Sequence, residues 1–294
     1  MHAAPTHVMR SVARHEGLGG RARIGSAVED LPAGAAGRGR VRVFWFFGTL
    51  QEFLPRSLAT MRGGFRSAAA LAIVLGACLP RGFGEPSCSA DGARAGLCAE
   101  SAAAPQFQLA ACTVFRDEDR FLREWLAFHL CVGIEHFFLY ADRPSDDCYM
   151  EILQPYVDAG QVTVTRGVSV RNPQIPTYDV CLRDHRHRAR WLAFIDVDEF
   201  LHPANASLLL RDVLADYADV AGLVVPWTLF GSSQHIAAPA GLVIDNYRYR
   251  RRLPECNGHT CAYKAIVQGA YTEHCDVHNH YYADGYFAVN EVPL

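Results

Sequence analysis

Short runs of apolar and β-branched residues alternate with amphipathic segments along the second two-thirds of the chain. The runs have the length and composition of buried strands. They lie at 109–115, 137–140, 162–165 and 191–195. Helical periodicity separates them, at 121–129, around 149–156 and over about 178–190, and Gly133 closes the first helix. Strands that alternate with helices form βαβ units, so the pattern predicts an α/β fold whose mostly parallel sheet is covered by helices on both faces.

The first 106 residues do not follow this pattern. Residues 1–60 are rich in Gly, Ala and Arg and are expected to be disordered, apart from an apolar run at 43–47. Residues 61–79 have a basic start and then an apolar stretch, which is typical of a secretory signal or membrane anchor. A start at Met61, a lipoprotein signal ending at Cys78 and a chance apolar run are the alternatives. Residues 80–106 have the composition of a linker, so we expect a leader over 1–106 and one folded domain over 107–294.

The composition is that of a globular protein, with 50% hydrophobic residues, 20% charged residues and a net charge of −3. This balance argues against a nucleic-acid partner. Lys264 is the only lysine, so a general excess of arginine is weak evidence for phosphate binding. Lys264 itself lies in an apolar run, where it could reach a phosphate as a point charge or face solvent on an edge strand.

Cysteine usage leaves the redox compartment open. The chain has 10 cysteines and no CxxC pair, so buried thiols and the disulfides of an oxidising compartment are both compatible with it. Asn205-Ala206-Ser207 is a glycosylation sequon, which favours the secretory pathway.

Acidic residues follow the predicted strands. In a parallel sheet, ligands bind beyond the carboxyl ends of the strands. The acids at those ends are Asp117, Glu118, Asp142, Asp196 and Asp198. Asp196 and Asp198 form a DxD pair after a buried strand. Two such carboxylates suit a divalent cation that also binds a diphosphate, and the cation would act as a Lewis acid toward that leaving group. An acidic turn without a ligand is the alternative.

Two later stretches add polar groups. After a strand that begins near 224, Gly231 permits close approach of a ligand, and Ser232 and Ser233 could hydrogen-bond a sugar or phosphate. Trp227 and Phe230 could stack on a sugar or belong to the core, and His235 follows the turn. The His- and Cys-rich segment 256–280 matches no common zinc module. His280 could instead supply a late metal ligand.

From about 109 to 290 the sequence resembles glycosyltransferase family 92 and related family-2-like enzymes. The resemblance is carried by 116–118, 122–129, 133–137, Tyr140, Gln174, Tyr178, Cys181, 191–200 and 227–233. It implies a Rossmann-like GT-A fold, a nucleotide-sugar donor (typically UDP-galactose), inversion at the anomeric carbon, and Mn²⁺ (or Mg²⁺) bound by Asp196 and Asp198. It places Asp117, Glu118 and Asp142 in the nucleotide pocket. Gln234 departs from the family, which usually has Gly there, and from the resemblance of its last segment we expect that the chain stops short of the family's C-terminus.

We therefore expect an inverting glycosyltransferase, in the Golgi lumen or anchored to a membrane of the secretory pathway, that acts on a glycan. A single displacement needs one general base. The candidates are His235, which we favour, and Glu199, Asp245 and Glu255. Lys264 is expected at the donor, and Trp227, Phe230, Ser232 and Ser233 at the acceptor. A sugar- or nucleotide-binding relic without turnover is the alternative. A phosphatase with a strand-end Asp is disfavoured, because Glu-Phe follows the second Asp instead of Gly-Thr.

Overall fold

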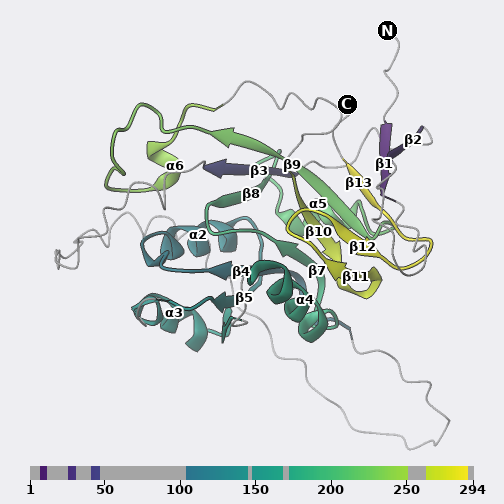
Figure 1. Ribbon diagram of the computed structural model, residues 1–294, viewed down its shortest axis with the longest axis horizontal. Helices are drawn as coiled ribbons and strands as arrows, with labels where there is room; N and C mark the ends of the chain where they lie inside the picture. The colour runs from purple at the N-terminus through teal and green to yellow at the C-terminus, as the bar shows by residue number, and fades with distance from the viewer. Residues whose placement is uncertain are drawn as a thin grey trace, which may run out of the picture.

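A computed structural model describes residues 7–11, 26–30, 41–46, 104–144, 148–167, 172–250 and 263–290. Within these residues a nine-stranded mixed sheet has the order β6-β5-β4-β7-β10-β9-β3-β8, and β13 pairs with β9 (Figure 1). Its strands are β3 (Val41–Phe46), β4 (Phe107–Phe115), β5 (His136–Ala141), β6 (Val162–Arg166), β7 (Ala189–Phe194), β8 (Glu199–Pro203), β9 (Gly222–Phe230), β10 (Tyr263–Gln268) and β13 (Ala288–Asn290). Two further pairs are β1 (His7–Ser11) with β2 (Ser26–Asp30), and β11 (Thr272–Cys275) with β12 (His280–Tyr282).

One half of the sheet is parallel. Strand β4 pairs in parallel with β5 and β7, and β5 pairs in parallel with β6. The helices that connect these strands are α2 (Asp119–Cys131), α3 (Tyr149–Asp158) and α4 (Gln174–His185), and the shorter α5 (Leu210–Ala215) and α6 (Val243–Asn246) follow later in the chain. Strand β10 lies antiparallel between β7 and β9. This arrangement confirms the predicted α/β fold with a mostly parallel sheet.

Alternate residues of β4 build the two faces of the sheet. Leu109 and Ala111 belong to the core cluster that includes residues of α2, α3 and α5, whereas Ala110 and Cys112 belong to the cluster on the α4 side. Because successive strand residues point to opposite faces, a strand that is apolar throughout must be covered on both. Helices therefore lie on both faces, as the run at 109–115 predicts.

Helix α4 differs from its predicted bounds. It begins four residues before Tyr178, with Pro176 in its first turn, where a missing N–H is tolerated. It ends at His185, and the residues expected to extend it to position 190 form a turn and the start of β7. Strand β7 pairs with both β4 and β10, so tertiary pairing outweighs the local helical periodicity at its start.

The leader contributes to the sheet. Strand β3, which contains most of the expected apolar run at 43–47, pairs in parallel with β9 and antiparallel with β8. The apolar run at 43–47 was excepted from the disorder expected over 1–60, and β1 and β2 form a further strand pair within that range. The expected signal or anchor at 61–79 lies outside the described residues. In the part of the chain that is described, no helix combines the length and apolar character needed to cross a membrane.

A disulfide joins the sheet to α4. Cys112 of β4 and Cys181 of α4 are bonded, with Cα atoms 6.3 Å apart, and both are fully buried. Cys275 is a buried thiol. Both alternatives that the cysteine count left open therefore occur, and the bond fixes α4 to the central parallel strands.

Candidate active site

The carboxyl ends of β4 and β7 bring four acids together. Asp117 and Glu118 follow β4, and Asp196 and Asp198 follow its parallel neighbour β7. Burial, followed by the charges of Asp198, Asp196 and Asp117, raises the pKa of Glu118 to about 8. The charges of these acids thus act on one another across the two strand ends, as expected for ligand sites in parallel sheets.

Asp196 is held by three donors. Its Oδ1 accepts hydrogen bonds from Gln174 Nε2 at 2.7 Å and from Tyr178 OH at 2.9 Å, and its Oδ2 accepts one from Lys264 Nζ at 2.8 Å. Burial, followed by the Asp196 charge, raises the pKa of Tyr178 well above its usual value, so the phenol keeps its proton. Both carboxylate oxygens of Asp196 are therefore engaged by the protein itself.

Gln174 and Tyr178 were assigned no role from the sequence beyond the family resemblance. They stand four residues apart on α4, and this spacing puts both side chains on the face of the helix that meets the end of β7. A polar pair at this spacing on a helix just before the DxD strand is the signal that could have identified them.

Lys264 and Glu199 form the buried part of the site. Their side chains are 1% and 0% exposed, and Lys264 Nζ lies 3.3 Å from Glu199 Oε2. Lys264 is therefore on a central strand, between β7 and β9, and the edge-strand alternative was wrong. The contacts of Lys264 Nζ in the structure are with the carboxylates of Asp196 and Glu199, and its expected contact with a donor stays a prediction. Glu199 is too deeply buried to touch an acceptor hydroxyl, which argues against its candidacy as the general base.

Burial controls the protonation of this pair. Burial raises the pKa of Glu199 well above its usual value, and Lys264 opposes only part of that effect. Burial lowers the pKa of Lys264, but Glu199 and Asp196 outweigh it and raise that pKa. Because one ammonium neutralises one carboxylate, we assign the charge pair to Lys264 and Asp196, with Glu199 holding a proton.

Helix α2 fixes the turn that carries the DxD pair. Trp125 Nε1 donates to the Glu199 carbonyl at 2.8 Å, and Leu201 N donates to His129 Nε2 at 3.0 Å. His129 Nδ1 therefore carries the proton and donates to the Trp125 carbonyl at 2.9 Å. Burial lowers the pKa of His129 to about 3, so the ring is neutral. The amphipathic helix predicted from its apolar positions thus also supplies polar anchors behind the site.

Asp142 does not have an open carboxylate. It is nearly fully buried after β5, where Arg116 binds its Oδ2 and Arg143 Nε lies 3.2 Å from its Oδ1. Two guanidinium groups thus contact its carboxylate, and the expected role of Asp142 in the nucleotide pocket stays a prediction. Its effect is to hold Arg116 and Arg143 at the ends of β4 and β5.

The loop after β9 is ordered by its own side chains. Ser233 Oγ accepts hydrogen bonds from the backbone N–H groups of Arg248 and Tyr249, at 2.8 and 2.9 Å. Gln234 has φ of +70°, a left-handed conformation that glycine adopts without strain. Glycine, which the family resemblance implies at this position, would adopt this conformation without strain.

The other candidate acceptor residues lie along β9 and this loop. His235 Nε2 bonds the Asn246 carbonyl at 3.1 Å, so Nε2 carries the proton and Nδ1 has the lone pair. Trp227 and Phe230 are half-buried and pack against the main core, and the Trp227 ring meets His278 edge-on. Ser232 is half-buried at the start of the loop.

Asp198 and Glu118 are the two acids of this cluster that could contribute oxygen ligands to a cation. Among the described residues, no three His, Cys, Asp or Glu side chains are arranged to hold a metal ion. Asp198 and Glu118 are close enough to interact electrostatically, and Mg²⁺-like ions commonly use one or two carboxylates and complete their shell with phosphate oxygens and water. His280 is buried against Phe194, and neither ring nitrogen has a hydrogen-bond partner within the described residues. Its metal role stays a prediction.

Glu118→Gln should change how stability depends on pH. The pKa of Glu118 is about 8 in the folded protein against an unperturbed 4.5, so the unfolded chain loses this proton first as pH rises. The wild type should therefore lose roughly 2 to 4 kcal/mol of stability between pH 4.5 and 8 relative to the variant. Urea unfolding at pH 5 and pH 8.5 in EDTA measures this, with Glu151→Gln on α3 as the exposed control. If the free energy of unfolding changed equally with pH in the wild type and in Glu118→Gln, the prediction would be contradicted.

The fold and the site define an α/β protein of the Rossmann-like glycosyltransferase class. The profile of glycosyltransferase family 92 matches residues 107–286, and the chain belongs to this family. A glycosyltransferase family 92 protein of Oryza sativa subsp. japonica is 34% identical over 152 residues, covering 50% of this chain and 25% of that protein. A family 92 protein of Ricinus communis is 33% identical over 153 residues, which cover 50% of this chain and 27% of that protein. The galactan beta-1,4-galactosyltransferase GALS2 of Arabidopsis thaliana is 33% identical over 96 residues, which cover 30% of this chain and 18% of that protein. The chain thus aligns with about a quarter of the length of its first relatives.

Proposed function

We propose that this protein is an inverting glycosyltransferase that moves galactose from UDP-galactose to a glycan hydroxyl. The observation that carries the proposal is the acidic cluster at the ends of β4 and β7, inside the region matched by the family. The name of the Arabidopsis relative, a galactan beta-1,4-galactosyltransferase, supports galactose as the transferred sugar and a galactan as the acceptor.

The two aspartates of the DxD pair have different tasks in this proposal. Asp196 is saturated by Gln174, Tyr178 and Lys264, so it orders the turn that presents Asp198. Asp198 and Glu118 would hold Mn²⁺ or Mg²⁺. The cation supplies Lewis-acid stabilisation of the departing diphosphate. This assignment differs from the expectation that both aspartates bind the metal.

His235 is our candidate for the general base. Its Nε2 is committed to the Asn246 carbonyl, which leaves the Nδ1 lone pair to accept the proton of the acceptor hydroxyl. The half-buried ring packs edge-on against Tyr247, so its orientation is defined. A single displacement needs only this one base.

The proposed location is the lumen of the secretory pathway, with anchoring through the leader. A fully buried disulfide, Cys112–Cys181, is typical of proteins that fold in an oxidising compartment. Asn205 of the sequon lies in an exposed turn after β8, where a glycan could be attached.

The proposal is tested by titrating UDP-sugars with and without Mn²⁺ and measuring released UDP. We expect release from UDP-galactose in the presence of Mn²⁺ and a galactan oligosaccharide, and loss of that release in EDTA. Binding of UDP without release from any UDP-sugar would contradict the proposal and favour a sugar- or nucleotide-binding protein without turnover.

A further inference from the structure

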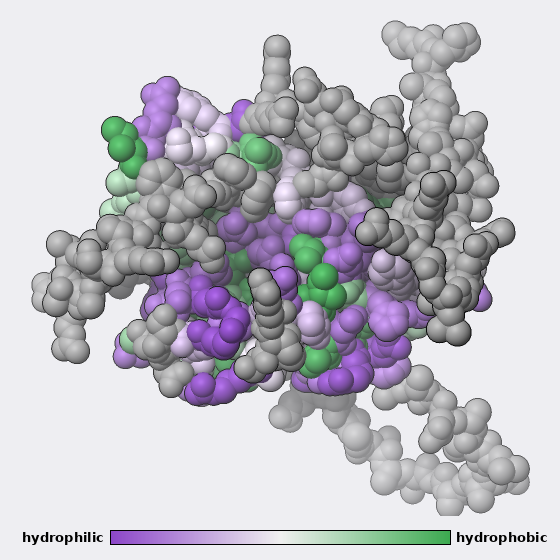
Figure 2. Space-filling view, viewed as in Figure 1, coloured by the Kyte–Doolittle hydropathy of each residue, from purple (hydrophilic) through white to green (hydrophobic). Residues whose placement is uncertain are grey.

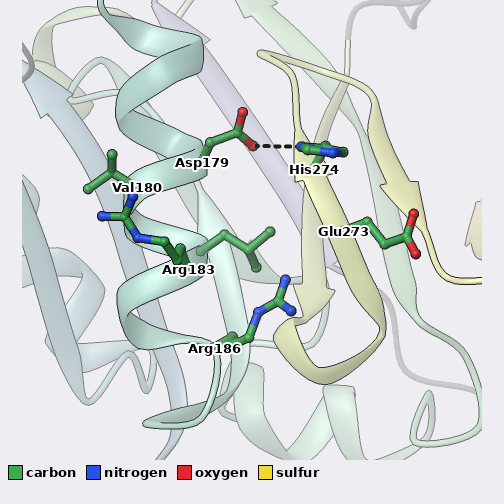
Figure 3. Close-up of a pocket in the computed structure, with 7 residues that line it drawn as sticks. Asp179, Val180, Arg183, Arg186, Glu273 and His274 are labelled. Carbon is green, nitrogen blue, oxygen red and sulfur yellow. Dashed lines mark ion pairs between the residues drawn. The ribbon is translucent and has the colours of Figure 1, made fainter.

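A hollow lies along α4, and its lining does not include the acids of the cluster. It has a volume of about 390 Å³ and is lined by Asp179, Val180, Leu182, Arg183, Arg186, Glu273 and His274. Figure 3 shows that α4 forms one wall and β11 the other, with Asp179 and His274 facing each other across it at 3.8 Å. The volume is within the range of small-molecule sites. We call this hollow the α4–β11 groove.

The charges of the groove balance. Arg183 and Arg186 are matched by Asp179 and Glu273, so the lining has no excess that would attract an anion at neutral pH. Guanidinium groups donate hydrogen bonds and carboxylates accept them. The ligand that suits such a lining is neutral and carries groups that can both donate and accept.

One buried donor in the groove lacks an acceptor. Arg186 bonds the Thr272 carbonyl through Nη2, but its Nε is buried and has no hydrogen-bond partner among the described residues. Buried polar groups are nearly always satisfied, and an unsatisfied one is costly.

An exposed aromatic ring borders the same side of the β11–β12 hairpin. Tyr281 pairs with His274 across the two strands, and directly opposed residues project from the same face. The adjacent pair, Cys275 and His280, is buried, whereas Tyr281 is 40% exposed and shares a face of the hairpin with His274, which lines the groove. Figure 2 shows a narrow apolar strip over α4 with hydrophilic residues on both sides. The surface therefore offers apolar faces next to polar groups.

We propose that the α4–β11 groove binds a neutral oligosaccharide, as a subsite for the part of the acceptor glycan that does not react. Sugar hydroxyls both donate and accept, and the apolar C–H face of a sugar ring suits Tyr281 and the strip over α4. The proposal rests on the proposed function for the identity of the glycan. Residues 174 and 178 reach Asp196, and the groove begins at the next residue and continues to Arg186, about 10 Å further along the helix. One helix thus spans the reaction centre and the subsite.

The test measures binding of a neutral β-1,4-linked galactotetraose to the full chain by calorimetry, in EDTA and without nucleotide. Tyr281→Ala and Glu273→Ala should each weaken binding about tenfold, whereas Tyr281→Phe and the control Glu151→Ala, an exposed glutamate on α3, should bind like the wild type. Two variants are used so that a folding defect in one does not decide the result. No binding by the wild type, equal binding by all variants, or preference for an acidic oligogalacturonide would overturn the proposal.

A second measurement separates this proposal from the proposed function. UDP binding should be the same in Tyr281→Ala and in the wild type, because the groove does not include the acidic cluster. With transfer active, Tyr281→Ala should raise KM for the tetramer about tenfold and leave KM for galactose unchanged. Galactotetraose binding that depends on Tyr281, without any UDP release, would support the groove and contradict the transferase. An equal rise in KM for both acceptors would overturn the groove.

Discussion

Asp198→Ala is expected to lower UDP release from UDP-galactose at least about a hundredfold with little change in the unfolding temperature. The magnitude is that for loss of one preorganised electrostatic contact to developing charge. Asp198 is half-buried in the turn after β7 and is one of the charges that raise the pKa of Glu118. Its removal deletes half of the two-carboxylate set that would hold the cation. Steady-state release of UDP at saturating Mn²⁺, with thermal unfolding in parallel, measures both effects.

Two controls make the result specific. Asp158→Ala removes an exposed acid at the end of α3 and should leave activity unchanged. Asp196→Ala should lower the unfolding temperature as well as activity, because Gln174, Tyr178 and Lys264 would lose their common acceptor. Full activity of Asp198→Ala, or full activity of the wild type with a chelator present, would refute a metal role for this carboxylate.

Lys264→Met is expected to destabilise the fold by about 3 kcal/mol and to reduce donor turnover with it. Removing the buried ammonium leaves the Asp196 carboxylate, which is 30% exposed, without its cation, and loss of one partner is the costly way to change an ion pair. Lys264 is 1% exposed, and its Nζ is 2.8 Å from Asp196 Oδ2. Methionine fills a similar length without the ammonium. Urea unfolding at pH 7 gives the free energy of unfolding for both proteins.

Glu199→Gln is the matched variant for this prediction. If Glu199 holds its proton, as burial favours, glutamine preserves its shape and neutral charge, so the free energy of unfolding should change by less than about 1 kcal/mol. An equally large loss in Glu199→Gln would mean that Glu199 is ionised and is the main partner of Lys264. No loss in Lys264→Met would show that the Lys264–Asp196 pair does not stabilise the site.

The parallel half of the fold could be read from local pattern. The run at 109–115 is buried on both faces, and α2 buries Leu122, Trp125, Leu126 and His129 at helical spacing. These elements were predictable because burial imposes periods of 2 and 3.6 on the chain. The bounds of α4 and the pairing of β3 were not, because each depends on strands that are distant in sequence.

The candidate site also has features that could be predicted from the sequence and features that could not. The DxD pair and the acids after β4 could be placed together from sequence, since parallel strands end at the same edge. The saturation of Asp196, the depth of Lys264 and Glu199, and the two arginines on Asp142 could not be predicted, because an apolar run is the same in sequence whether it becomes an edge strand or a central one.

The sequence alone thus determined the order of strands and helices in the parallel half of the fold, the sheet edge at which the acids gather and the family to which the chain belongs. Only the tertiary structure decided that Asp196 and Asp142 are held by side chains from other parts of the chain and that Lys264 and Glu199 are buried beside Asp196. The reason is physical: periodicity is a local consequence of burying one side of a segment, whereas the burial and charge partners of a side chain are set by elements that meet across the whole fold.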